Sequence, residues 1–429
     1  MIASYFRRVR VILRSQESRS IFLLSSGNIT NAAVGFVTSI VILRRLDTNG
    51  IALLYPLLGI LNVTEQVADL GISTSFVKFA SAIQHENLLK FQTLCKSFFK
   101  TKLCLSGLIL VIGQLLAPWI TQLVFKSDRY VGWVRITLLM ASFSNLSSFH
   151  QSYLQIQYRF HALMLTRVVP NLLKVSLIGL LFFFNAVSFE GAYLAFAAVP
   201  MGILLLSLFF SGTEYLKVPS APAGNFMEIL HFSKWVLISV VSVAVMGQID
   251  VLMLRSLADP NEVSRLVGGS RIASIFLILS SSLVTVLFPT ISSMKTREEI
   301  RLYLRRFKLV LPPLGLFLTI CMIFSPWIIH LLLGPRYENS VSVFKIYCFQ
   351  FAVDFFLTPF GLALYNLGKV HILSGLNFTQ LLIMILSNYL LIPLLGAEGS
   401  ALSGLIIRIF AFVLILTICR QEKLIGGAS

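Results

Sequence analysis

Two carboxylates lie four residues apart inside one apolar segment of the chain. Glu65 and Asp69 both fall within residues 51–72, and side chains four residues apart share one face of a helix. Like charges at this spacing disfavour double ionisation, so at least one carboxyl tends to keep a proton. Acidic groups embedded in a membrane are typical of proton relays in transporters. Glu65 and Asp69 are therefore candidate ion-coupling residues.

Two more acids, Asp250 and Asp354, also lie within apolar segments. Each is a further candidate for ion coupling. The alternative for either acid is simple charge pairing with Arg271, Arg255 or Lys345, because an embedded charge is costly unless it is paired. The sequence does not assign the partners.

Three basic residues, Lys174, Arg271 and Arg408, lie inside apolar segments as well. Such cations could bind a phosphate or another anion. The alternative for each is a structural ion pair or a side chain that extends to the membrane surface, which applies most to Arg408 near the end of its segment.

Uncharged polar residues recur at three- and four-residue steps within the apolar segments. Any one of them could simply hold two helices together. Because such groups are costly in lipid, we expect them to face one another or a water-filled cavity. Together they predict a hydrophilic cavity whose amides and hydroxyls suit sugar hydroxyls. The candidate cavity residues of this type are Asn28, Asn31, Asn145 and Gln151.

The elements that must position these side chains are membrane-spanning helices. Hydrophobic residues make up 56% of the chain and charged residues only 12%, which excludes a soluble domain with a solvated surface. About 20 apolar residues cross a bilayer as a helix. Twelve runs of this kind occur, at 21–43, 51–72, 103–125, 130–156, 163–185, 191–211, 232–255, 266–290, 309–333, 341–366, 371–394 and 398–419. We therefore predict an all-α polytopic membrane protein with twelve transmembrane helices.

Short sequences recur at a nearly constant spacing, which indicates a duplicated chain. Ala117-Pro118-Trp119-Ile120 returns 208 residues later as Ser325-Pro326-Trp327-Ile328, and Glu190-Gly191-Ala192 returns at the same offset as Glu398-Gly399-Ser400. Weaker matches at an offset of 210 join Arg159 to Lys369 and Arg135 to Lys345. Six spans separate the copies, so we expect two six-helix lobes related as a parallel repeat, with a central site enclosed between them.

Basic residues predict the orientation, because Lys and Arg accumulate in cytoplasmic segments. With the N-terminus inside, 23 of the 35 basic residues fall in inner segments and nine in outer ones. Both termini are therefore predicted to be cytoplasmic. The predicted parts are a basic N-terminal segment at 1–20, an N-lobe at 21–211, a cytoplasmic linker at 212–230, a C-lobe at 231–420 and a tail at 421–429.

Several other functions have no support in the sequence. The five cysteines form no paired motif, and there is no metal-ligand cluster, phosphate-binding loop or nucleophile elbow. We expect no catalytic residues, no metal and no cofactor, and hence no enzyme. The net charge of +17 is explained by contact with anionic phospholipid headgroups, so no nucleic-acid partner is expected.

Several motifs resemble the polysaccharide-biosynthesis flippases. Leu43-Arg44-Arg45-Leu46, ending at Gly50, and the later Asp69-Leu70-Gly71-Ile72 resemble that family's opening, although Leu46-Asp47-Thr48 stands where the family usually has Leu-Gly-Pro. The second half follows the family's order and spacing at Gln248–Leu254, Gly268-x-x-Arg271-Ile272, Phe288-Pro289-x-Ile291-Ser292, Gly334-Pro335-x-Tyr337 and Gly396–Ala401. The resemblance covers nearly the whole chain.

The resemblance implies an O-antigen-type flippase of the multidrug/oligosaccharidyl-lipid/polysaccharide superfamily. Such a protein would move an undecaprenyl-pyrophosphate-linked oligosaccharide from the cytoplasmic to the outer leaflet of a bacterial inner membrane by alternating access, driven by protons. It would serve the synthesis of O-antigen or another surface polysaccharide, with a polysaccharide polymerase and a chain-length regulator as functional partners.

Two alternatives remain for the function. A drug exporter of the same superfamily would favour an acidic or aromatic pocket for organic cations, whereas the first apolar segment here carries asparagines and no acid. A membrane glycan polymerase would have a similar composition, but such enzymes tend to carry a large outer loop, and the outer segments here stay short.

Overall fold

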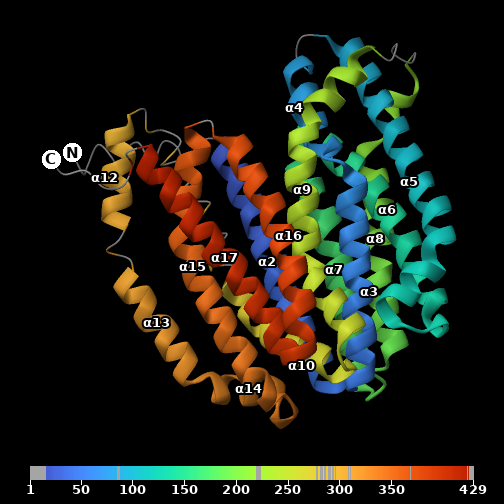
Figure 1. Ribbon diagram of the computed structural model, residues 1–429. Helices are drawn as coiled ribbons and strands as arrows, with labels where there is room; N and C mark the ends of the chain where they lie inside the picture. Colours follow the sequence, from blue (N-terminus) through green and yellow to red (C-terminus); the bar gives the residue numbers. More distant parts are fainter. Residues whose placement is uncertain are drawn as a thin grey trace. The chain divides into compact units, whose positions relative to one another are not determined.

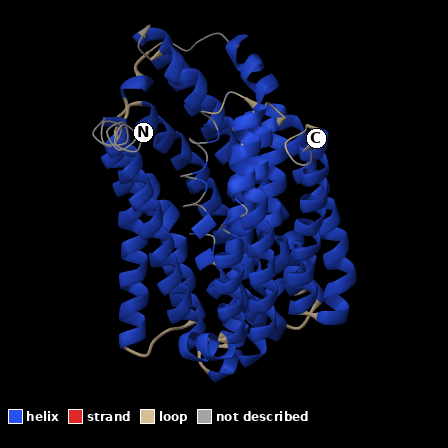
Figure 2. Ribbon diagram, turned by 90° about the vertical axis from the view of Figure 1, so that its left-hand side faces the viewer, coloured by secondary structure: helices blue, strands red, loops and turns tan. Residues whose placement is uncertain are grey.

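The computed structural model describes residues 16–84, 87–218, 224–276, 296–307, 311–367 and 369–422, with isolated positions between 277 and 295 and at 309 and 424. For residues 16–29, 224–236, 306, 311, 370 and 371 it describes the backbone alone. Every element in this part of the chain is helical (Figure 2). The all-α prediction is therefore confirmed.

The predicted spans coincide with helices (Figure 1). They are α2 (Gln16–Arg45), α3 (Thr48–Asp69), α5 (Leu88–Phe125), α6 (Val131–Ile156), α7 (Phe160–Phe183), α8 (Phe189–Ser211), α9 (Gly224–Leu257), α10 (Pro260–Ala273), the pair α13 (Leu311–Ile323) and α14 (Ser325–Leu333), α15 (Val341–Asn366), α16 (Val370–Leu395) and α17 (Ala397–Gln421). Much of the span predicted at 266–290 lies outside the described residues. The shorter helices are α4 (Ile72–Ile83) and α12 (Arg297–Phe307).

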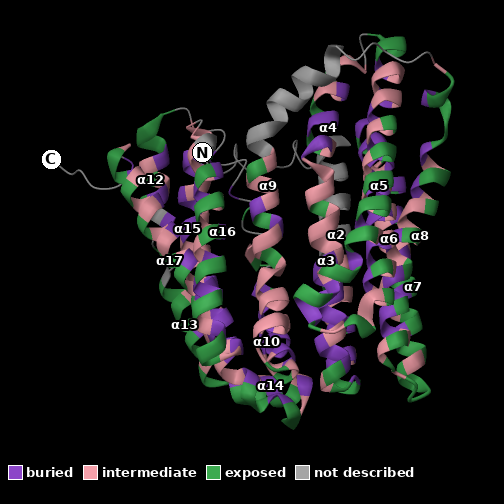
Figure 3. Ribbon diagram, turned by 45° about the vertical axis from the view of Figure 1, so that its right-hand side comes forward, coloured by how far each residue is buried: buried purple, intermediate pink, exposed green. Residues whose placement is uncertain are grey.

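Within the described residues, eight helices are long and apolar enough to cross a membrane, or nine if the bent pair α13 and α14 counts as one span. The more polar α2 and α6 contain 30 and 26 residues, which is also long enough to cross at about 1.5 Å per residue. Exposed apolar side chains run along α5 and α13 (Figure 3). On a membrane protein such surfaces face lipid hydrocarbon.

The chain divides into two compact units. The first unit comprises residues 1–41, 64–117 and 135–233, and the second comprises 42–63, 118–134 and 234–429. In the first unit α7 packs along α8, and in the second α17 packs along both α15 and α16. The lobe boundary at 212–230 stays a prediction.

The helix starts follow the spacing of the sequence repeat. Helices α6 and α15 are both 26 residues long and begin 210 residues apart, at Val131 and Val341. The starts of α7 and α16 are also 210 apart, and those of α8 and α17 are 208 apart. The recurring Glu-Gly sequence lies in the first turn of α8 and of α17. The two copies therefore share one helical register.

The span predicted at 309–333 is not one straight helix. It is broken after α13, and α14 continues at an angle of 61°. Pro326 is at the start of α14, where its missing N–H and its ring prevent the preceding helix from continuing. The equivalent Pro118 is accommodated inside the unbroken α5.

The turn that departs from the family's usual sequence is closed by its own side chain. Helix α2 ends at Arg45 and α3 begins at Thr48. The backbone N–H of Gly50 donates to the Asp47 carboxylate at 3.1 Å, which is the bond of a helix N-cap. Asp47 therefore begins α3 without the usual glycine and proline.

Gly399 allows α17 to begin directly against the end of α16. A Cβ at this position would lie 2.2 Å from the backbone oxygen of Leu391. We expect Gly399→Ala to destabilise the protein by about 1–3 kcal/mol, because a backbone carbonyl cannot turn aside as a side chain can. Gly191→Ala at the repeated position is the matched control, since its Cβ would meet the tip of Leu181 at 3.0 Å. Thermal unfolding in detergent should give the order wild type, Gly191→Ala, Gly399→Ala, and the reverse order of the two variants would contradict this account.

Candidate functional site

A break between two helices positions the first predicted acid pair. Helix α3 ends at Asp69 and α4 begins at Ile72, and the two residues between them, Leu70 and Gly71, have φ values of 51° and 68°. Left-handed backbone is unfavourable for a leucine, so the turn is held by its surroundings. It places the Asp69 carboxylate at the C-terminal end of α3, where the helix dipole disfavours a negative charge.

Lys102 compensates this charge from α5. Its side chain is only 1% exposed, and its ammonium forms an ion pair with Asp69. The same ammonium donates to the Asn145 side-chain oxygen on α6 at 3.1 Å. Asn145 in turn donates to the Ser106 hydroxyl at 3.0 Å. A lysine this deeply buried is retained only with partners of this kind.

Serine hydroxyls extend the network around this ion pair. Ser73 on α4 donates to the Asp69 carboxylate and lies 3.3 Å from the Ser148 hydroxyl on α6. Ser144, also on α6, hydrogen bonds to Glu65. Charge interactions link Glu65 to both Asp69 and Lys102. Helices α3, α4, α5 and α6 thus bring Glu65, Asp69 and Asn145 together, as a set of polar residues facing one another. We call the residues Glu65, Asp69, Ser73, Lys102 and Asn145 the first-unit network.

Lys102 is not among the candidate residues predicted from the sequence. The predicted apolar span begins at 103, so Lys102 falls in the basic segment before it. In the structure α5 begins at Leu88 and includes Lys102. The signal was present: Phe91, Cys95 and Phe98 are buried at three- and four-residue steps, and Lys102 is the next residue of that series. A lysine on the buried stripe of a helix should have been assigned to the interior.

The predicted residues Gln151 on α6 and Lys174 on α7 contact other polar side chains of α7. The Arg167 guanidinium donates to the Gln151 side chain at 2.8 Å, and the Lys174 ammonium donates to Asn171 at 2.9 Å. Lys174 also lies 4.7 Å from the centre of the Phe196 ring on α8. A cation against an aromatic face keeps its charge while part of its solvation is replaced.

The two asparagines predicted on α2 are less defined. Asn31 has a buried side-chain oxygen with no hydrogen-bond partner among the described residues. Asn28 lies in α2, but its side chain is outside the described part. Their assignment to a cavity stays a prediction.

In the second unit Asp354 pairs with Arg408. The guanidinium Nε of Arg408 on α17 lies 2.7 Å from the Asp354 carboxylate on α15, and the side chains are 26% and 40% exposed. Arg408 also donates to the backbone oxygen of Gly404 at 2.9 Å. The pairing expected between Asp354 and Arg271, Arg255 or Lys345 is wrong, because α17 brings Arg408 closer.

Asp250 has an amide as its hydrogen-bond partner. Asn388 on α16 donates to the Asp250 carboxylate on α9 at 2.9 Å, and Arg408 interacts with Asp250 through its charge. Tyr347 on α15 interacts electrostatically with Asp250, Arg408 and Arg271. Three of the predicted charges therefore lie around one tyrosine.

Arg271 is held by an aromatic ring. Its guanidinium lies 4.8 Å from the centre of the Tyr55 ring, and Tyr55 is 3% exposed. Among the ion pairs of the described residues, Arg271 has no carboxylate partner. A guanidinium that is stacked but unpaired keeps its N–H groups available for an anion.

Because Asp354 is paired with Arg408, we expect Asp354 to contribute more to stability than Asp250 does. Asp354→Asn should lower the stability by about 1 kcal/mol, a modest loss because solvent screens a pair that is partly exposed. Asp250→Asn should cost less, since an amide can still bond to Asn388. Thermal unfolding of the two variants in detergent checks the order, and a larger loss for Asp250→Asn would contradict it.

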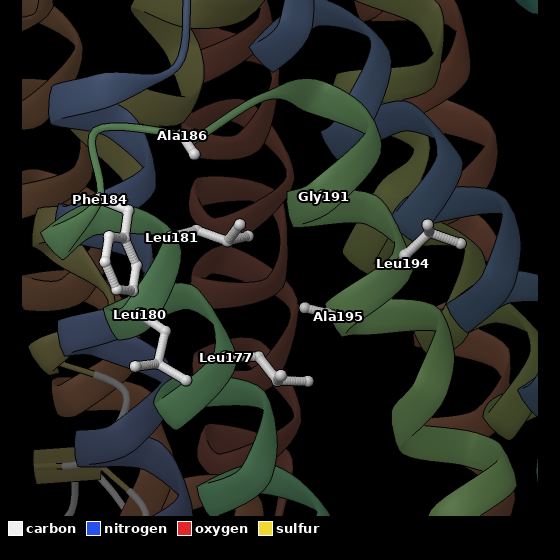
Figure 4. A pocket seen from close by; sticks show the side chains of 8 residues that line it. All are labelled: Leu177, Leu180, Leu181, Phe184, Ala186, Gly191, Leu194 and Ala195. Atoms are coloured by element: carbon white, nitrogen blue, oxygen red, sulfur yellow. The ribbon is translucent and has the colours of Figure 1, made fainter.

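An apolar cavity of about 350 Å³ lies between α7 and α8 (Figure 4). It is lined by Leu177, Leu180, Leu181, Phe184, Ala186, Gly191, Leu194 and Ala195. Several of these side chains are exposed, including Phe184 at 71%. The lining suits hydrocarbon, so the cavity is separate in chemistry from the polar networks.

Within the described residues, no group of three or more histidine, cysteine or acidic side chains could hold a metal ion. All five cysteines are free. The embedded charged and amide groups of each unit are its candidate functional residues.

Solved structures with the same fold are membrane transporters. A lipid II flippase, MurJ, in an inward closed conformation matches with a TM-score of 0.74 and 14% identity over 93% of this chain and 87% of that one. A multidrug transporter of the MATE family and MOP superfamily, in an inward-facing conformation, matches with a TM-score of 0.73 and 13% identity over 92% and 96%. A MOP superfamily transporter from Pyrococcus furiosus matches at 0.65 and 15% over 96% and 97%. These similarities show that the chain has the fold of these transporters.

The family follows from the sequence comparison. The model of the polysaccharide biosynthesis protein family matches residues 18–295, and the chain belongs to this family. No curated protein matches the sequence. The resemblance to a polysaccharide-biosynthesis family that was identified from the motifs is thus confirmed.

Proposed function

We propose that the protein moves an undecaprenyl-pyrophosphate-linked oligosaccharide from the cytoplasmic to the outer leaflet of a bacterial inner membrane. The observation that carries this proposal is Arg271, an embedded guanidinium that is stacked on Tyr55 and has no carboxylate partner among the described ion pairs. A guanidinium binds phosphate groups, and hence a pyrophosphate, through two parallel hydrogen bonds. Membership of the polysaccharide biosynthesis family supports a glycan as the remainder of the substrate.

The other embedded groups fit the same substrate. In the first unit Lys174 carries a positive charge that suits an anion, and Asn145, Gln151 and Asn31 carry amides of the kind that bind sugar hydroxyls. The lipid tail would stay in the membrane while the headgroup crosses by alternating access. No residue is assigned a catalytic role, and a surface glycan such as O-antigen in lipopolysaccharide would be the end product.

Proton coupling is part of the proposal. Glu65 and Asp69, together with Asp250 and Asp354, are the acids that could take up and release protons. Glu65→Gln and Asp69→Asn should each impair glycan export, and normal export by both variants would remove them as coupling residues. Both termini would lie in the cytoplasm. A polysaccharide polymerase and a chain-length regulator would be functional partners of the transporter.

Gene deletion in the native host tests the function directly. We expect complete lipid-linked repeat units to build up on the cytoplasmic face and the surface glycan to be lost, with rescue by the intact gene. Single units that accumulate on the outer face would point to a polymerase instead. Normal export would contradict the flippase.

A multidrug exporter is the second candidate, because a MATE transporter has nearly the same TM-score as the lipid II flippase. Organic cations bind to aromatic rings and to acids. Asp69 and Asp354 are paired with basic side chains here, whereas Glu65 and Asp250 have no ion pair among the described residues. Efflux of ethidium from cells that express the protein would favour this alternative.

A further inference from the structure

The first-unit network contains its own cation. The Lys102 ammonium contacts the Asp69 carboxylate and the Asn145 side-chain oxygen, and Ser73 also bonds to that carboxylate. Carboxylate, amide and hydroxyl oxygens are the ligands that hard cations bind. A carboxylate oxygen from α3 and an amide oxygen from α6 thus contact the ammonium as they could contact a sodium ion, and a hydroxyl from α4 contacts the same carboxylate.

We propose that Lys102 is a tethered cation in this site, so that the first unit exchanges protons and does not bind sodium. This inference rests on the proposed proton-coupled transport and gives the reason why sodium does not take the place of the proton. A sodium ion would have to displace an ammonium that is covalently attached and only 1% exposed. A proton faces no such competition, because it adds to a carboxylate oxygen.

The charged groups around Lys102 determine how the binding of one proton changes the net charge of the first-unit network. The charged groups that face Lys102 in the described residues are Asp69 and Glu65, both from α3. Helices α4 and α6 contribute Ser73 and Asn145, which do not titrate. With all three charged groups ionised, the network has one excess negative charge. A proton that forms an O–H bond on either carboxylate neutralises this excess and leaves the other as the only carboxylate facing the ammonium.

Removal of the lysine should convert the network into a sodium site. In Lys102→Ala the oxygens of Asp69, Ser73 and Asn145 remain, while the ammonium is gone. We expect sodium chloride, compared with choline chloride at equal concentration and pH 8, to raise the melting temperature of this variant by about 3–5 °C, because a ligand that binds only the folded state stabilises it. The wild type and Lys102→Arg should show no difference between the two salts.

The full-length protein in detergent is used throughout, with Lys102→Ser as a second small variant. Lys102→Ala/Asp69→Asn is the matched control and should lose the sodium effect with the carboxylate. Sodium stabilisation of the wild type would overturn the proposal, as would a folded Lys102→Ala or Lys102→Ser without a sodium response. The measurement uses no lipid-linked glycan, so a wrong substrate in the proposed function would leave its result unchanged.

Discussion

Arg271→Ala is expected to abolish glycan export while the protein still folds. The guanidinium lies on the Tyr55 ring at 4.8 Å, and a cation–π contact contributes only about 0.5–2 kcal/mol to stability. Loss of charge-assisted hydrogen bonds to a pyrophosphate, at about 1.5–3 kcal/mol, should weaken headgroup binding about 10–100-fold. Export of surface glycan in a deletion strain, with the amount of protein in the membrane measured in parallel, checks this expectation.

Arg255→Ala is the matched control for Arg271→Ala. Arg255 on α9 also lies against an aromatic ring, at 5.5 Å from the centre of Phe125. Its substitution removes the same kind of contact and the same charge, but we assign it no substrate. Arg271→Lys should keep part of the activity, since it retains the charge and loses the planar two-point contact. Equal export by Arg271→Ala and Arg255→Ala would show that Arg271 does not bind the headgroup.

The positions of the helices could be predicted because each helix corresponds to a long apolar run in one continuous stretch of the sequence. The predicted start at 341 is the start of α15, and the predicted starts of α6, α16 and α17 differ by one residue from those in the structure. Predictions failed where a charged residue lies on a buried helical stripe, as Lys102 does, and where a proline divides an apolar run, as Pro326 does. Hydropathy alone assigns Lys102 to the surface, and it does not reveal the helix break at Pro326.

The partners of the embedded charges could not be predicted, because they come from helices far apart in the sequence. Asp354 and Arg408 are 54 residues apart, and Asp250 and Asn388 are 138 apart. Tyr55 is more distant still from Arg271. The spacing of polar residues within one helix shows which face is polar. It does not show which other helix covers that face.

The duplication repeats the helices and not the chemistry. With the offsets of 210 and 208, Lys174 corresponds to Met384, and Arg408 corresponds to Pro200. Each unit nevertheless contains an embedded acid in an ion pair with a basic residue, Asp69 with Lys102 and Asp354 with Arg408. The residues that form these two ion pairs lie at non-equivalent positions of the repeat.

A double-mutant cycle on Lys102 and Asp69 should separate stability from transport. Either single change, Lys102→Met or Asp69→Asn, leaves one buried charge without its main partner, and we expect each to destabilise the protein by about 3–5 kcal/mol. Lys102→Met/Asp69→Asn removes both charges and should recover most of that loss, because methionine fills the space of the lysine stem in an apolar environment.

Transport should not follow stability in this cycle. The double variant has no ionisable pair at this position, so it should stay inactive in glycan export although it folds, if Asp69 carries the coupled proton. Thermal unfolding in detergent and export in a deletion strain measure the two quantities on the same three variants. Recovery of export in the double variant would mean that the pair only holds α3 and α5 together. In that case the coupling residues would have to be sought among Glu65, Asp250 and Asp354.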